Sequence, residues 1–235
     1  EPTATAERPP TGSGVTSGRI DALAPPRLDA TGWLLLVCLS ALWGASFLFA
    51  KIALAALDPL ALVLARVSLA AATLHAVIAV LGRRPLWRVP RAWRVLLFGV
   101  TNNVIPFSLI FWAQQSLDVG IAAILNATTP IFAMMIAAVS TADERITPAK
   151  VLGMAIAFAG VAAIVGFKSL AGVEGHLLPA LALLGASLFY GISAVWARRL
   201  TDVAPIEIAV GQLTGSTIVL AVLVPVLAPL PTAVP

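Results

Sequence analysis

Aromatic and hydroxyl side chains recur at helical spacing inside two long apolar runs of the sequence. Trp43 and Ser46 lie three positions apart, as do Tyr190 and Ser193, so each pair shares one face of a helix. Polar and aromatic groups at membrane depth are typical of solute pathways. We therefore expect the two faces to form two walls around a small molecule, with close helix packing through serine as the alternative.

Two clusters that join asparagine to a proline predict bends. Asn102 and Asn103 precede Pro106, and Asn126 precedes Pro130. Proline removes the hydrogen bond to the carbonyl four residues earlier, which kinks a helix and frees polar groups. We expect the three amides to face the solute and the two prolines to mark gating bends. Hydrogen bonds from the amides to a neighbouring helix are the alternative.

Three basic residues in or beside the runs have two interpretations each. Arg66 lies inside a run, where an unpaired charge costs about 3 kcal/mol unless it faces water or snorkels to the interface. Lys51 ends the first run and either contacts an anion or anchors the helix. His75 is a proton relay or, as we favour, a packed histidine with a hydrogen-bond partner.

Few features of the sequence indicate a catalytic site. Ser46 lacks the following glycine of a nucleophile elbow, and the single Cys38 excludes a disulfide within the chain or a cysteine-rich metal site. The runs are expected to hold no acidic residue, which removes paired carboxylates. We expect no catalytic residue, no metal and no cofactor. An intramembrane enzyme or a channel-like protein is the alternative to a transporter.

The composition places these residues in a lipid environment. Of 235 residues, 60% are hydrophobic and 11% charged, and the mean hydropathy is +0.98. A soluble domain has about 25% charged residues. The net charge of +4 does not indicate nucleic acid, because the basic residues fall between apolar runs. The expected partners are lipid and a small solute.

Seven apolar runs each approach the roughly 20 residues that span a bilayer. They cover residues 33–50, 59–81, 95–115, 119–139, 148–167, 177–197 and 205–228. Basic residues concentrate in the second, fourth and sixth connections, which predicts that these connections and the N-terminus are cytoplasmic. These residues are Arg83, Arg84, Arg88, Arg91, Arg94, Arg145, Lys150, Arg198 and Arg199.

The first and sixth runs are similar to each other. Trp43 to Lys51 aligns without gaps with Tyr190 to Arg198, at an offset of 147 positions. An offset of five spans is odd, so equivalent helices cross the membrane in opposite directions, as in inverted-repeat carriers. We expect one complete five-helix half and the first two helices of a second, about seven helices of ten.

Three stretches resemble the EamA-type branch of the drug/metabolite transporter superfamily. They are WGASFLFAK from Trp43, FWAQQSLDVGIAAILNATTPIFAMMIAAV from Phe111 and DERITPAKVLGMAIAFAGVAAIV from Asp143. The resemblance implies an all-α, polytopic secondary transporter of a bacterial cytoplasmic membrane. It also implies alternating access between two inverted repeats, often for export of a small metabolite or drug-like solute.

The expected organisation has three parts. A polar, disordered, cytoplasmic tail covers residues 1–31, a first five-helix repeat covers 32–168, and the start of a second repeat covers 176–235. A homodimer stays open as a further arrangement.

Overall fold

The structure is a computed structural model that describes residues 29–89, 91–140, 146–165 and 175–227. The predicted tail at 1–31 falls almost entirely outside these residues. The chain divides into two compact units, one ending at Leu42 and the other beginning at Trp43. In the first unit, the Ser40 hydroxyl donates to the Leu36 carbonyl at 2.8 Å, inside the first helix. The second unit contains the remainder of that helix and the helices that follow it.

Within the described part of the chain, six stretches of helix are long and apolar enough to cross a bilayer. Four are single helices: α1 (Ala30–Ala53), α2 (Pro59–Val80), α9 (Leu177–Ala197) and α10 (Pro205–Leu227). Two are composite: α3 (Ala92–Gly99), π-helical η3 (Val100–Val104) and α4 (Ile105–Gln114) form one, and α5 (Val119–Asn126) and α6 (Thr129–Ser140) the other. The rest are η2 (Leu86–Arg88) and α7 (Pro148–Val165). The prediction of an all-helical, polytopic bundle is confirmed.

Local chemistry explains where two of the spans begin. The Asp58 carboxylate accepts from the Leu60 N–H at 2.9 Å and Pro59 occupies the first turn, so α2 starts at an N-cap. Glu207 lies in the first turn of α10 and accepts from the Ala204 N–H at 3.3 Å, where the helix dipole favours a carboxylate. The expectation that the runs hold no acidic residue is therefore wrong at this helix end.

Both composite spans are interrupted beside a proline. The π-helical turn η3 ends two residues before Pro106. Between α5 and α6, the Thr128 hydroxyl donates to the Leu125 carbonyl at 2.6 Å and the Thr129 hydroxyl to the Asn126 carbonyl at 2.8 Å. These hydroxyls supply partners for carbonyls at the break, as an interrupted helix in lipid requires.

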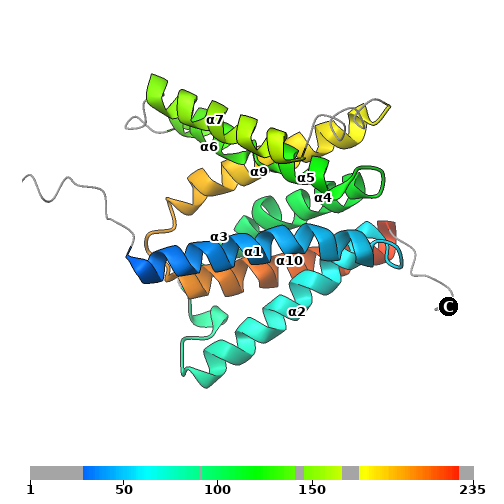
Figure 1. Cartoon of the computed structure of the whole chain (residues 1–235). Helices are drawn as coiled ribbons and strands as arrows, with labels where there is room; N and C mark the ends of the chain where they lie inside the picture. The colour runs from blue at the N-terminus through cyan, green and yellow to red at the C-terminus, as the bar shows by residue number, and fades with distance from the viewer. Residues whose placement is uncertain (1–28, 90, 141–145, 166–174, 228–235) are drawn as a thin grey trace, which may run out of the picture. The chain divides into compact units, whose positions relative to one another are not determined.

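Helices α9 and α10 organise the second unit (Figure 1). α9 packs against α4, α5 and α6, α10 packs against α2 and α3, and η3 contacts both α9 and α10. The approach of α10 to α3 depends on glycine. A Cβ at Gly215 would lie 2.2 Å from the Leu96 carbonyl oxygen, and one at Gly99 would lie 2.1 Å from that of Gln212. Backbones this close are typical of membrane helices that meet through small residues.

Two pairs of connections meet in the second unit: the second with the sixth, and the first with the third. Arg94, after the second connection, pairs with Asp202 at 3.1 Å and donates to the Arg199 carbonyl at 2.7 Å, both in the sixth connection. Lys51, beside the first connection, donates to the Leu117 carbonyl in the third at 3.1 Å. This pairing is what an alternating set of spans requires. The cytoplasmic identity of either end stays a prediction.

Candidate functional site

An aromatic pocket gathers side chains from four helices. α1 contributes Trp43 and Ser46, α2 contributes Arg66, α9 contributes Tyr190, and α4 supplies the wall that follows Pro106. The four site residues predicted from these three helices thus lie together. The lining of this Trp43–Tyr190 pocket consists of Trp43, Ser46, Phe47, Arg66, Phe107, Ile110, Phe111 and Tyr190.

Ring contacts join the walls of the Trp43–Tyr190 pocket. The centroids of Trp43 and Tyr190 lie 6.1 Å apart at an interplanar angle of 63°, and those of Phe107 and Tyr190 lie 6.4 Å apart at 76°. Phe107 also stacks on Phe111 at 5.9 Å. Such pairs contribute about 0.5–1.5 kcal/mol each beyond their buried area. Tyr190 is therefore held from two sides, which fixes the direction of its hydroxyl.

Arg66 enters the same pocket as a charge at membrane depth. Its Nη1 donates to the Ser46 hydroxyl at 2.6 Å, and its Cζ lies 4.5 Å from the centroid of the Phe107 ring. Among the described residues, the acidic side chain that forms salt bridges is Asp202, and its partners are Arg91 and Arg94. Arg66 is thus stabilised by a hydroxyl and a π face, without a carboxylate to neutralise it.

Tyr190 brings an unpaired donor to the Trp43–Tyr190 pocket. The residue is only 9% exposed, and its hydroxyl is buried without a hydrogen-bond partner among the described residues. A buried polar group left in this state costs about 1–3 kcal/mol. The free volume of the pocket is about 10 Å³, which is the room that one water needs. The pocket therefore combines a cation and a free hydroxyl around a space that is nearly closed.

The amides of η3 lie elsewhere, against α10. Asn102 Nδ2 donates to Gln212 Oε1 at 2.7 Å, and Asn103 Nδ2 donates to the Ser216 hydroxyl at 3.1 Å. Neither asparagine lines the Trp43–Tyr190 pocket. These contacts match the alternative of hydrogen bonds to a neighbouring helix. Solute contact through the two amides stays a prediction.

Ser193 does not mirror Ser46 in its contacts. The Ser193 hydroxyl donates to the Thr101 hydroxyl at 3.1 Å and lies outside the lining of the Trp43–Tyr190 pocket. Thr101 belongs to η3, so α9 and α10 are both tied to this π-helical turn through polar side chains. Of the four residues predicted to form two walls, Trp43, Tyr190 and Ser46 line the pocket, and Ser193 does not.

The break between α5 and α6 lies beside a second cavity. Pro130 lines a pocket of about 170 Å³ between this span and α7, where Met154 and Phe158 form the opposite wall. Asn126 Oδ1 is buried without a hydrogen-bond partner among the described residues. Asn126 and Pro130 are therefore separate from the Trp43–Tyr190 pocket, and their roles in solute contact and gating stay predictions.

Sequence reasoning missed the part of the site that α4 contributes. Phe107 and Phe111 are four positions apart and follow Pro106, a helical spacing that marks one face and was available from the sequence. Gln114 is fully buried, and its Nε2 donates to the Phe47 carbonyl at 3.1 Å. The sequence around Gln114 does not predict this contact, because the accepting carbonyl belongs to Phe47 on another helix.

Lys51 and His75 have structural partners. Lys51 donates to the carbonyls of Gln114 and Leu117 at the end of α4, where a cation neutralises the unpaired carbonyls of the helix terminus. His75 Nε2 lies 3.0 Å from the Thr214 hydroxyl on α10. The interpretation of His75 as a packed histidine with a hydrogen-bond partner matches this geometry.

The described residues form six candidate spans, and four of these line a pocket that holds an uncompensated cation, which is the arrangement of a multi-pass membrane protein of the transporter type. Residues 30–166, more than half of the chain, match the EamA-like transporter family. The chain belongs to this family of membrane transporters.

A curated relative and a solved structure show similarity over most of the chain. An uncharacterized transporter of Archaeoglobus fulgidus is 30% identical over 158 residues, which cover 67% of this chain and 55% of that protein. The chain therefore spans about half the length of that relative. A protein of known crystal structure shares the fold at a TM-score of 0.62 and 20% identity, over 83% of this chain and 67% of the other.

Proposed function

We propose that the protein is a secondary transporter that carries a small organic solute across the cytoplasmic membrane by alternating access, with the Trp43–Tyr190 pocket on the solute path. The observation that carries this proposal is that Arg66 and the unpartnered Tyr190 hydroxyl belong to the lining of the same pocket at membrane depth. Among the described residues, Arg66 has no carboxylate to neutralise it, although Ser46 and Phe107 contact it, and the Tyr190 hydroxyl has no hydrogen-bond partner. A passing solute with polar atoms can supply a partner to both.

The near absence of free volume fits one phase of a transport cycle. A drug-sized solute needs a cavity of about 300–1,000 Å³, whereas the Trp43–Tyr190 pocket has about 10 Å³. Alternating access requires a state in which the path is closed between the two sides. The described conformation is such a closed state for this part of the path. Opening it requires the aromatic contacts of Tyr190 to separate.

The symmetry of the proposed inverted repeat also supports a solute site at the Trp43–Tyr190 pocket. Trp43 and Tyr190 occupy equivalent positions of the proposed repeats, and their ring centroids lie 6.1 Å apart. Residues on a pseudo-two-fold axis meet their own equivalents, and carriers place their solute sites at such a repeat interface. The repeat boundaries, at 32–168 and from 176 onward, belong to this proposal, as does the cytoplasmic position of the N-terminus.

Reconstitution tests the proposal. The complete gene product is placed in liposomes and labelled metabolites are screened for flux, beside Arg66→Gln and the control Arg88→Gln. For a solute that moves, Arg66→Gln should lower flux per folded molecule about tenfold, since a lost hydrogen bond to a charged group is worth about 1.5–3 kcal/mol. Arg88, outside the spans, should be neutral. Flux no faster than leakage from empty liposomes for every solute would contradict the transporter proposal.

A further inference from the structure

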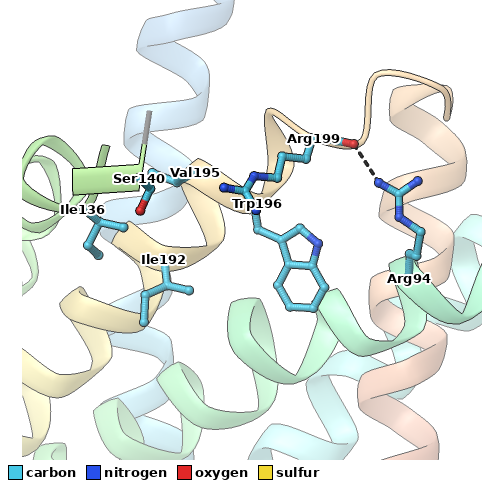
Figure 2. Close-up of a pocket in the computed structure, with 7 residues that line it drawn as sticks. All are labelled: Arg94, Ile136, Ser140, Ile192, Val195, Trp196 and Arg199. Carbon is cyan, nitrogen blue, oxygen red and sulfur yellow. Dashed lines mark hydrogen bonds between the residues drawn. The ribbon is translucent and has the colours of Figure 1, made fainter. Parts of the chain in front are cut away.

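A second pocket lies at the end of the second unit where α3 begins and where α6 and α9 end. Its volume is about 300 Å³, at the lower limit of small-molecule sites. It is separate from the Trp43–Tyr190 pocket and shares no lining residue with it. Figure 2 shows its lining residues, which are Arg94, Ile136, Ser140, Ile192, Val195, Trp196 and Arg199. We call this cavity the Arg199 pocket.

One arginine of the Arg199 pocket is already occupied. Arg94 Nη1 lies 3.1 Å from both carboxylate oxygens of Asp202. Figure 2 shows its second contact, in which Arg94 Nη2 donates to the Arg199 carbonyl at 2.7 Å. Arg91 lies 3.7 Å from the same carboxylate. Asp202 therefore forms ion pairs with two guanidinium groups, those of Arg91 and Arg94. It does not leave a carboxylate free to neutralise a third.

The second arginine has a different position. The Arg199 side chain runs back along α9 toward the part of the pocket where Ser140 lies (Figure 2). Among the described residues no hydrogen bond or ion pair engages the Arg199 guanidinium, whereas its backbone carbonyl accepts from Arg94. Among the described residues, Arg91, Arg94 and Arg199 thus outnumber the one carboxylate, Asp202, at this end of the cavity. Its floor is aliphatic: Ile136, Ile192 and Val195.

Tryptophans place the Arg199 pocket at the depth of the lipid headgroups. Trp87 and Trp93, in the connection and the first turn before Arg94, are 80% and 60% exposed, and Trp196 lines the pocket itself. Tryptophan is enriched at the membrane–water interface, where its ring sits at the headgroup level. Basic pockets between helices at this depth suit lipid head groups.

We propose that the Arg199 pocket binds the phosphate group of an anionic phospholipid. The phosphate ion-pairs with the Arg199 guanidinium and accepts from the Ser140 hydroxyl, while the glycerol carbons lie on the aliphatic floor. The volume holds a phosphoglycerol headgroup, so the acyl chains remain in the surrounding bilayer. The bound lipid would connect the ends of α6 and α9. A role of Arg199 limited to neutralising the C-terminal carbonyls of α9 is the competing explanation.

The test measures lipid stabilisation of the complete protein. Melting temperatures are recorded in phosphatidylcholine nanodiscs with increasing phosphatidylglycerol, at constant ionic strength, for wild type, Arg199→Gln and Arg88→Gln. We expect phosphatidylglycerol to stabilise the wild type, and Arg199→Gln to need about fivefold more lipid for the same shift, because the charge-assisted pair with the phosphate is lost and about 1 kcal/mol corresponds to this factor. Arg88→Gln carries the same charge change outside the pocket and should resemble the wild type.

Two further arms keep the proposal open to refutation. Ser140→Asp, at an exposed helix end, keeps Arg199 and puts a carboxylate beside the phosphate position, so it should also weaken the lipid effect. Water-soluble glycerol phosphate at the lipid's concentration should not stabilise the protein. Equal losses in Arg199→Gln and Arg88→Gln would show a diffuse field and overturn the pocket. Stabilisation by glycerol phosphate as strong as by lipid would overturn the lipid assignment.

Discussion

At the scale of single residues, the Trp43–Tyr190 pocket holds groups that would be better satisfied elsewhere. The Tyr190 hydroxyl is buried without a partner among the described residues, and Arg66 is stabilised by Ser46 and Phe107 in place of an acid. Each arrangement lowers stability compared with an apolar residue of similar shape. Such costs concentrate at functional sites, where a ligand or another conformation supplies a partner for the unsatisfied group.

Tyr190→Phe separates stability from transport. The ring contacts with Trp43 and Phe107 stay, while the unpaired hydroxyl is removed. We expect the free energy of unfolding to rise by about 1 kcal/mol, because a buried unsatisfied donor is lost. Flux of a transported solute should fall in the same variant. Melting curves and liposome flux measure the two effects, and a lower stability with unchanged flux would show that the hydroxyl is bonded in the resting protein.

At the scale of helices, the packing of α3 against α10 rests on positions without side chains. A Cβ at Gly215 would lie 2.2 Å from the Leu96 carbonyl oxygen, which is backbone and cannot rotate away. Asn102 and Asn103 lie in η3, which continues α3, and their partners lie on α10, so the separation of the two spans sets those hydrogen bonds. Tight backbone contact and polar bonds thus stabilise one interface together.

Gly215→Ala should destabilise the bundle by about 1–3 kcal/mol, because the added methyl forces the helices apart. Gly44→Ala is the matched control, since a Cβ at Gly44 meets no atom within 4 Å. Melting temperatures of both variants in the same detergent make the comparison. Equal melting temperatures for the two variants would contradict the close approach of α3 and α10.

Several elements were predictable from the sequence for physical reasons. Apolar runs located the spans to within a few residues, because a bilayer demands a minimum length of helix. Pro106 and Pro130 marked the interruptions of regular helix, since proline lacks the backbone donor. The partners were not predictable. That Lys51 would cap α4, or that Asn102 would meet Gln212, depends on which helices pack together, and no local pattern records this.

At the scale of the whole molecule, the charges at the two ends are unequal. The second connection carries Arg91, the first turn of α3 carries Arg94 and the sixth connection carries Arg199, and the two connections meet through Asp202. At the other end, Lys51 donates a hydrogen bond to the Leu117 carbonyl. Basic loops resist translocation, so the arginine-rich end is expected in the cytoplasm. The Arg199 pocket would then face the inner leaflet, where anionic lipid attracts basic segments.

Cysteine accessibility tests this orientation. Single cysteines at Ser116→Cys and Arg88→Cys are introduced after Cys38→Ser removes the natural thiol, and intact cells are treated with a membrane-impermeant thiol reagent. Position 116 should be labelled from outside, and position 88 only after the cells are opened. Both positions are exposed, so burial does not prevent labelling. The reverse pattern would place the N-terminus outside.

The central claim is that the Trp43–Tyr190 pocket lies on the solute path. It is tested most directly by comparing two tryptophan-to-alanine substitutions in one flux assay. Trp43 is 43% exposed and contacts Tyr190, whereas Trp93 is 60% exposed and lies outside this pocket. Both are measured in liposomes as flux per folded molecule. Trp43→Ala should lower flux about tenfold, or roughly 1.4 kcal/mol, while Trp93→Ala should match the wild type. Equal flux in the two variants would contradict the account.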